Sequence, residues 1–588
     1  MSNTKKNSLR PSARGEQILT VLIILQFMMI CIVNLTQLRA LIGYDSSSGY
    51  LMVNKIVEQR SLVLKDWAYQ TTMGWDSPVL GAAFFCAFLH DPFLSFGLSN
   101  ILSVAVMVIL FTLLLREMNI SGIASRLAVV MLLTPYTAAY SGENALDYLS
   151  MTCINMGSYS YRIIFLFALA IVYLRFQRDF PKAKAPVSTK KGKTTKQPAA
   201  SFVVSKSTIV IAVFASALAF IIGICTGISM IILLVAPFLL HAGILFLVRN
   251  DSRELKAPSF LFACAQAVLI FIGKLFSTHV LHFVGRAESI EWIPAEKFFS
   301  NIGGLFSGYF GLTYALPLKS QVTITTKLGI AFGVMLCIAL FLLVCSIVVM
   351  VRTIRSKDLG GPVFLFTILI LLNTFVLLFS NSSYSSEGTE PRYFIYILIS
   401  FMLLTCHLLR DFHPNAKVLV QKYFIPVVVL CFMFSNFMFY YSAYHHRVNL
   451  QRYENITYQI GLTKAPVVYT YGDDILFDSR VLRALDPNGV IYHQIASDFS
   501  GIDVWGDTTE KMTADQWSGT VAYLMTPENY KKMPPYVAAT FTSVIQVEDY
   551  YLCTADTNVI TNEYLASPNK DEFIVVVDEP VTVNSESV

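Results

Sequence analysis

An acidic residue stands directly behind the first long apolar stretch of the chain. Residues 17–40 are mainly apolar, and Asp45 follows them after a short Leu-Ile-Gly-Tyr run. A carboxylate at such a membrane boundary can act as a general base that takes a proton from a hydroxyl group. Two plainer interpretations stay open, because Asp45 could simply be solvated or could cap a helix that starts at residues 46–48.

Three cations lie at or within other apolar stretches. Arg162 and Arg392 each stand at the head of one, and Lys274 lies inside another. Cations placed against the usual cytoplasmic bias of basic residues need a phosphate or carboxylate partner, and a lysine within lipid must face a cavity or an acid. A guanidinium can grip phosphate oxygens with two parallel hydrogen bonds. For Arg392 an ion pair with Glu390 or Glu387 is the structural alternative.

Polar and aromatic side chains suited to contact a sugar occur in the predicted outer loops. Trp75 has a plainer interpretation, which we favour, as part of an interfacial aromatic belt. Asp76 can equally be a turn residue before Ser-Pro, and the others can be ordinary loop residues. With these alternatives open, the predicted substrate-binding residues are Asp76, Trp75, Glu143, Asp147, Tyr159, Glu390 and Tyr393.

The elements that must position these residues are membrane helices. The chain has 588 residues, of which 55% are hydrophobic and only 14% charged, with a mean hydropathy of +0.57. A helix needs roughly 20 apolar residues to cross the hydrocarbon core. About eleven stretches qualify, namely residues 17–40, 94–115, 122–140, 160–175, 208–226, 228–248, 259–284, 329–352, 362–381, 392–408 and 423–443. The sequence therefore predicts a polytopic α-helical membrane protein, whose first span is an uncleaved anchor.

Lysine and arginine set the predicted orientation. Residues 1–16 are basic, as is the Lys-, Pro-, Ser- and Thr-rich segment 176–207, which has the composition of a disordered linker. Both are predicted to be cytoplasmic. Alternate threading then places the outer loop 41–93 and the tail 446–588 outside. The tail holds 9 Lys and Arg against 20 Asp and Glu, a net charge of −11, whereas the preceding residues carry +16.

Two regions outside the spans have recognisable patterns. In the outer loop 41–93, the amphipathic residues 50–63 and the short apolar residues 79–89 predict two helices along the membrane surface. In the tail, short strand-like segments alternate with turns and helical stretches, which predicts a small α/β domain. No CxxC or Cys/His ligand spacing is present, so the sequence indicates neither a zinc site nor a disulfide framework.

With these residues in view, the chain resembles the GT-C superfamily of polyprenyl-phosphate-dependent membrane glycosyltransferases. The resemblance covers residues 17–445 and rests on three features. These are the anchor followed at once by Asp45, the long first loop with Trp75-Asp76-Ser77-Pro78, and the late Glu390-Pro391-Arg392-Tyr393. It implies that Asp45 is the base or positions the acceptor, and that Arg392 meets the lipid phosphate. We assign Arg162 and Lys274 to the same donor phosphate.

The expected function is therefore an inverting transfer of a sugar from a polyprenyl-phosphate donor to an extracytoplasmic glycan or lipid acceptor, in a bacterial plasma membrane. Many superfamily members carry paired acids at the first position, whereas serines at 46–48 follow Asp45. No cofactor is certain, and a divalent metal such as Mg or Mn stays open. The alternatives are a transporter or flippase of lipid-linked glycans and a non-catalytic surface assembly factor. Nucleic-acid binding is not expected.

Overall fold

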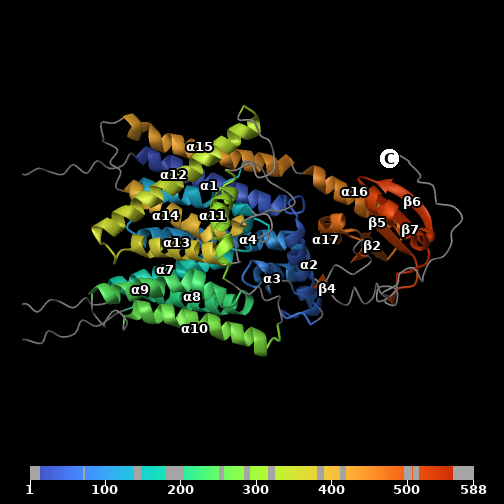
Figure 1. Cartoon of the computed structure of the whole chain (residues 1–588), viewed down its shortest axis with the longest axis horizontal. Coiled ribbons are helices and arrows are strands. Elements are labelled where there is room, and N and C mark those ends of the chain that lie inside the picture. Colours follow the sequence, from blue (N-terminus) through green and yellow to red (C-terminus); the bar gives the residue numbers. More distant parts are fainter. Residues whose placement is uncertain are drawn as a thin grey trace, which may run out of the picture.

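The molecule is elongated, with a bundle of long helices at one end and a smaller domain containing a β-sheet at the other (Figure 1). It is known from a computed structural model. The structure describes residues 13–560 except residues 66, 70–72, 138–146, 156, 180–203, 250–256, 284–291, 316–324, 381–389, 411–418, 446, 496–505 and 508–515.

Ten helices among the described residues are long and apolar enough to cross a membrane. This is the architecture of a polytopic helical membrane protein. The spans comprise α1 (Ala13–Thr36), α4 (Pro92–Glu117), α7 (Ser160–Asp179), α8 (Lys206–Cys225), the π-helix η1 (Ile231–Val235) continued by α9 (Ala236–Arg249), α10 (Pro258–His279), α12 (Lys327–Ser356), α13 (Pro362–Phe379), the 3-10 helix η5 (Pro391–Phe394) continued by α14 (Ile395–Arg410), and α15 (Leu419–His445) with α16 (Arg447–Thr463).

The sequence predicts one span more, and the difference lies at residues 122–140. Helix α5 (Gly122–Leu132) has 11 residues and stops shortly before Pro135. A proline disfavours helical backbone in the residue before it, which accounts for the early end. Eleven residues reach roughly 16 Å, about half of the hydrocarbon thickness.

The chain still returns across the bundle between α4 and α7. Glu117 at the end of α4 pairs with Arg175 near the end of α7 (Oε1–Nε, 2.7 Å), so both helices end on the same side. Residues 133–137 are buried, and Gln26 Nε2 of α1 donates to the Val130 carbonyl (3.2 Å) near the end of α5. Irregular backbone is tolerated at membrane depth where it is enclosed by protein. We infer that α5 and residues 133–137 make the crossing together.

Charged side chains mark the two ends of the bundle. At one end, which we call the basic end, Glu16 of α1 pairs with Arg126 of α5 (2.5 Å), and Glu117 pairs with Arg175 and Arg178 of α7. The predicted disordered linker would attach here, but residues 180–203 lie outside the described part of the chain. We call the opposite end the α2 end.

Two short helices of the first loop cover the α2 end (Figure 1). Helix α2 (Tyr44–Gln59) starts earlier than the predicted residues 50–63, because the Ser46 hydroxyl accepts a hydrogen bond from the Gly43 amide (2.8 Å) and so stabilises the start of the helix. Helix α3 (Val79–Leu89) matches the predicted residues 79–89 and packs on α4. Tyr50 fixes α2 to the bundle through Phe93 and Phe96, with ring centroids 4.3 and 4.8 Å away.

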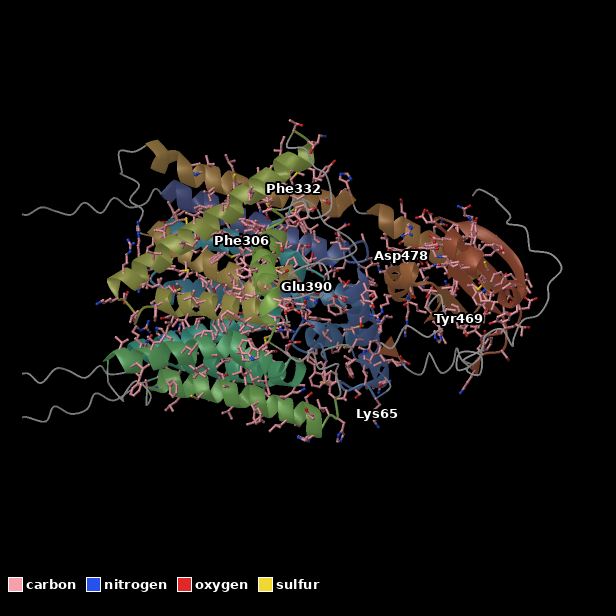
Figure 2. All side chains as sticks on the ribbon, in the orientation of Figure 1. Lys65, Phe306, Phe332, Glu390, Tyr469 and Asp478 are labelled. Atoms are coloured by element: carbon pink, nitrogen blue, oxygen red, sulfur yellow. The ribbon has the colours of Figure 1, made fainter. Side chains whose placement is uncertain are left out.

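Helix α11 (Phe298–Leu312) lies across the direction of the spans rather than along it (Figure 1). Its Phe299 and Phe306 rings are 79% and 57% exposed, and Figure 2 shows Phe306 on this helix. On its other side Gly308 packs against Phe394 of η5, and an added Cβ at this glycine would overlap that ring. α11 therefore fixes the position of η5.

The C-terminal domain contains a five-stranded mixed sheet, in agreement with the predicted α/β domain. The strands run in the order β3 (Ile491–Ile495), β2 (Val467–Tyr471), β5 (Val521–Met525), β7 (Tyr550–Ala555) and β6 (Phe541–Val547). β2 is parallel to both β3 and β5, whereas β7 is antiparallel to β5 and β6. The parallel pair needs a crossover helix, which α17 (Leu476–Leu485) supplies between β2 and β3.

This domain docks on the first loop of the membrane bundle. Helix α17 packs on α2. In addition, β1 (Trp67–Ala68) of the first loop pairs antiparallel with β4 (Gly506–Asp507) of the domain. The domain therefore sits at the α2 end, opposite the basic end (Figure 1).

Candidate functional site

A buried ion pair joins two loops that are far apart in sequence. Asp76 lies just before α3, and Arg162 lies in the first turn of α7. Arg162 Nε and Nη2 both donate to Asp76 Oδ2, at 2.7 and 2.6 Å. Thr226, at the end of α8, donates to the same oxygen at 2.5 Å. The side chains of Asp76 and Arg162 are 2% and 11% exposed, so water screens this pair little.

A local turn presents Asp76 to this pair. Gly74 has a positive φ of +72°, which glycine adopts without strain. Its carbonyl accepts hydrogen bonds from the backbone amide (3.2 Å) and the hydroxyl (2.5 Å) of Ser77. The turn is anchored further by Ser99 of α4, which donates to the Pro78 carbonyl at 2.7 Å. The Gly-Trp-Asp-Ser-Pro segment thus aims its carboxylate at α7.

Three buried asparagines hold the second loop beneath the first. Asn100 of α4 donates to Asn34 Oδ1 of α1 (2.9 Å) and to the Asn155 carbonyl (2.8 Å). Asn34 donates to the Cys153 carbonyl, and Asn155 donates to the Leu41 carbonyl, both at 2.9 Å. These bonds satisfy loop backbone that would otherwise be buried without partners.

An aromatic ring connects this ion pair with a second charged group. Tyr159 is buried, and the Arg162 guanidinium lies 4.9 Å from its ring centroid. Burial raises the pKa of the Tyr159 phenol, and the positive charges of Arg162 and Arg392 oppose that rise. Tyr396 of α14 completes the group, with its ring 6.0 Å from that of Tyr159.

The second charged group lies on η5, at the start of the α14 span. Arg392 forms an ion pair with Glu390, and its guanidinium lies 5.5 Å from the Tyr393 ring centroid. The side chains of Arg392 and Glu390 are 31% and 32% exposed, so this pair is accessible to a ligand. Figure 2 shows Glu390 at the end of the bundle that faces the C-terminal domain. The structural alternative from the sequence, an ion pair with Glu390, is therefore present.

Asp45 lies in the first turn of α2 and is exposed. It does not cap the helix, because the N-cap residue is Gly43, whose amide donates to the Ser46 hydroxyl (2.8 Å). Within the described part of the chain, its carboxylate makes no hydrogen bond or ion pair. It does interact electrostatically with Arg392, across the α2 end. The arrangement offers a free carboxylate close to a partly exposed guanidinium.

Lys274 of α10 approaches the same region from another side. Its aliphatic stem lies beside the hinge that follows α8, and a Cβ on Gly227 would come within 3.3 Å of its Cδ. Gly227 has a φ of +73° and follows Thr226, the partner of Asp76. Among the described residues the Lys274 ammonium has no ion-pair partner. It is a second cation that an anionic ligand could engage.

The remaining predicted site residues are placed differently. Trp75 is 8% exposed and packs in an apolar cluster with Met73, Cys225 and Phe283, so its ring joins the loop to α8 and α10. Asp147 caps the short helix α6 (Tyr148–Thr152), where it accepts bonds from the Ser150 amide and hydroxyl. Within the described part of the chain, Asp147 makes no hydrogen bond or ion pair with Asp76 or Arg162.

Two further predictions concern Glu143 and a metal. Glu143 lies outside the described residues. In the described part of the chain, no three His, Cys, Asp or Glu side chains are grouped so that they could hold a metal ion. The question of a divalent metal therefore stays open.

Sequence reasoning missed several residues that build the site. Thr226, Tyr396 and the three asparagines carry no motif, and their side chains come together only because four helices and two loops meet at the α2 end. Among them, Asn34 and Asn100 could have been singled out as amides inside apolar stretches, which are costly in lipid unless they are bonded. Thr226 gave only the signal of a Thr-Gly hinge between two spans.

Comparison of the chain with protein-family models gives no match, and comparison with curated proteins gives no significant one. The family resemblance therefore stays an expectation from the sequence.

Proposed function

We propose that the chain is a membrane glycosyltransferase that moves a sugar from a polyprenyl-phosphate donor to an acceptor outside the cell. The observation that carries the proposal is the exposed Asp45 carboxylate, which interacts electrostatically with the partly exposed Arg392. A base and a cation at the membrane boundary are what such a transfer needs at its two reacting oxygens.

The proposed reaction is a single displacement. An acceptor hydroxyl attacks the anomeric carbon of the sugar and gives its proton to Asp45. The bond from that carbon to the phosphate oxygen breaks, and the lipid phosphate leaves with the electron pair. Attack from the face opposite the leaving group inverts the anomeric centre.

The three cations of the candidate site have different capacities for the phosphate. Arg392 is partly exposed, and among the described carboxylates only Glu390 forms an ion pair with it. Lys274 has no ion-pair partner in the described part of the chain. Arg162, by contrast, directs both Nε and Nη2 to Asp76. We therefore assign the lipid phosphate to Arg392 and Lys274, and a positioning role to Arg162.

Asp76 is the other carboxylate of the site, but it is unsuited to be the base. It is buried and receives three hydrogen bonds on one oxygen. With 2% of its side chain exposed, Asp76 offers an acceptor hydroxyl little access. Its role is to fix the first loop, and with it the approach to Asp45.

The distribution of charge favours transfer over transport. Transporters place ionisable residues near the middle of the membrane. In the candidate spans that the structure describes, Asp, Glu, Lys and Arg lie toward the ends, except in the long last one, where Arg447, Arg452 and Glu454 belong to α16, beyond the end of α15. The buried polar group near mid-span, Gln26, Thr134 and Asn436, is uncharged. A non-catalytic assembly factor is the remaining alternative, and a test of Asp45 separates it.

In the test, cells that lack this gene are complemented with a gene copy that encodes wild type, Asp45→Asn or Glu58→Gln. Glu58 is a matched control, because it is an exposed carboxylate on the same helix, paired only to Lys55 three residues earlier (3.2 Å). Wild type and Glu58→Gln should restore the sugar on the surface glycan. Asp45→Asn should leave the sugar on its lipid carrier, at equal protein levels. Equal restoration by Asp45→Asn would overturn the proposal.

A further inference from the structure

The C-terminal domain contacts the helix that carries Asp45 at its first residue. Arg480 of α17 lies over the ring of Tyr44, with its guanidinium carbon 4.2 Å from the ring centroid. Arg480 is 5% exposed, so this contact is shielded from water. A cation over an aromatic face is attracted more strongly when the contact is desolvated. Tyr44 is the first residue of α2 and the direct neighbour of Asp45.

Arg480 is held firmly on its own side. The neighbouring Ser479 hydroxyl bonds Thr470 of β2 (2.9 Å), and the next residues Val481 and Leu482 are buried against the sheet. Close by on the same helix, Asp478 accepts a hydrogen bond from the Tyr453 hydroxyl (2.7 Å).

The Asp478 carboxylate also pairs with Arg452 (3.1 Å) and with Tyr550 of β7. Figure 2 shows Asp478 on the side of the domain that faces the membrane bundle. α17 is therefore fixed to α16 and to the sheet.

The first turn of α2 needs such support. The first four amides of a helix have no partner within it, and helix ends fray. Tyr50 anchors the next turns of α2 to the bundle, and at the start of the helix the Gly43 amide donates to the Ser46 hydroxyl (2.8 Å). Tyr44 and Asp45 lie on the turn between these anchors, and Arg480 is the buried cation that covers it.

We infer that Arg480 is a positioning residue that acts through the Tyr44 ring to hold the first turn of α2, and thereby the Asp45 carboxylate, in its place. The inference rests on the proposed role of Asp45 as the base. It gives the C-terminal domain a defined part in the reaction, because a carboxylate must be held within a few tenths of an ångström to accept a proton efficiently.

The first readout needs no substrate. Hydrogen exchange of the amides of residues 47–51 is measured in the full-length chain in detergent, since Ser47 is the first amide to bond into the helix, to the Gly43 carbonyl (2.9 Å). Arg480→Ala should raise their exchange roughly tenfold. Tyr44→Phe keeps the ring and should leave exchange unchanged, whereas Tyr44→Leu should raise it without touching the domain.

Two controls keep the result interpretable. Lys532→Ala removes a cation of the same domain that is 56% exposed. Lys532 lies on α19 (Pro527–Lys532), which packs on β7, so the substitution should leave the exchange of α2 unchanged. Cys553 of β7 is buried, so its resistance to alkylation reports that the domain stays folded in Arg480→Ala.

The second readout is transfer from the lipid-linked sugar pool that accumulates in cells lacking the gene. Arg480→Ala and Tyr44→Leu should lower the maximal rate of transfer about tenfold, with little change in the donor concentration at which the rate is half-maximal. Unchanged exchange in these variants would overturn the inference, as would loosened exchange with an unchanged transfer rate. If exchange loosens but Asp45→Asn transfers normally, the proposed function fails while the docking contact stands.

Discussion

Replacement of Asp76 by asparagine should open the first loop, and Cys225 provides a local probe of that opening. The Cys225 thiol is buried against the backbone amides of Trp75 and Asp76. In Asp76→Asn the Arg162 guanidinium stays buried without its anionic partner. Removal of one partner of a buried pair costs about 3–5 kcal/mol.

The lower figure applies here because the carboxamide introduced by Asp76→Asn would still accept a hydrogen bond from Arg162 or Thr226. A cost of about 3 kcal/mol that appears as local opening raises alkylation of Cys225 roughly 100-fold, at about 1.4 kcal/mol for each factor of ten. The assay is the rate of alkylation in native membranes, read by mass spectrometry. Cys553 in the sheet of the C-terminal domain should keep its wild-type rate.

The matched variant is the double substitution Asp76→Asn with Arg162→Met. It removes the stranded charge and should recover most of the protection of Cys225, since the two residues are coupled. Alkylation of Cys225 at the wild-type rate in Asp76→Asn would refute the reasoning. Additive effects of the two substitutions would refute it as well, because they would show that the pair does not hold the loop.

Three more predictions follow from particular contacts. Gly308→Ala should destabilise the protein by about 1–3 kcal/mol, because the new methyl group overlaps Phe394. Gly303→Ala on the same helix points into open space and should be neutral or stabilising. Thermal unfolding in detergent compares the two variants. Gln26→Leu should cost about 1 kcal/mol in the same assay through the loss of its bonds to α5 and α15, and unaltered stability would show that these bonds do not support the broken crossing. Burial raises the pKa of Asp147 above its ordinary 3.8, so the folded state binds this proton more tightly than the unfolded state. The stability of the protein therefore falls as the pH rises from 3.8 through the raised pKa of Asp147. Asp147→Asn keeps the helix cap and should therefore be at least as stable as wild type at pH 7. The difference in stability between variant and wild type should vanish below pH 3.8. A larger stability gain of the variant at low pH would contradict the raised pKa of Asp147.

Much of the fold could be predicted because hydrophobicity in lipid is a strong local signal. The long apolar stretches form the ten candidate spans, and residues 79–89 form α3 as expected. The prediction of residues 122–140 as one helix was wrong, since apolarity records burial in the membrane domain but not the break that Pro135 imposes.

Individual residues of the candidate site could be predicted from the sequence, but the contacts between them could not. Charges at outer span boundaries are rare enough to single out Asp45, Arg162 and Arg392. Which of them pair is a tertiary property: Arg162 meets Asp76 across 86 positions of sequence. The buried asparagines stand out only as amides inside apolar stretches, which does not name their partners. A cation from a separate domain, Arg480, has no local signature, because its role arises from the surfaces that it joins.

The most direct test of the proposed function follows a labelled sugar from lipid to acceptor. The lipid-linked pool from cells lacking the gene is added to membranes that contain wild type, Glu58→Gln or Asp45→Asn, and the loss of label from the lipid fraction is timed. Removal of a general base lowers a rate by about 10²–10⁴-fold. We predict such a loss for Asp45→Asn alone, with the Arg162–Asp76 loop still protected at Cys225. Label that leaves the lipid at the wild-type rate with Asp45→Asn would contradict the role of Asp45 as base.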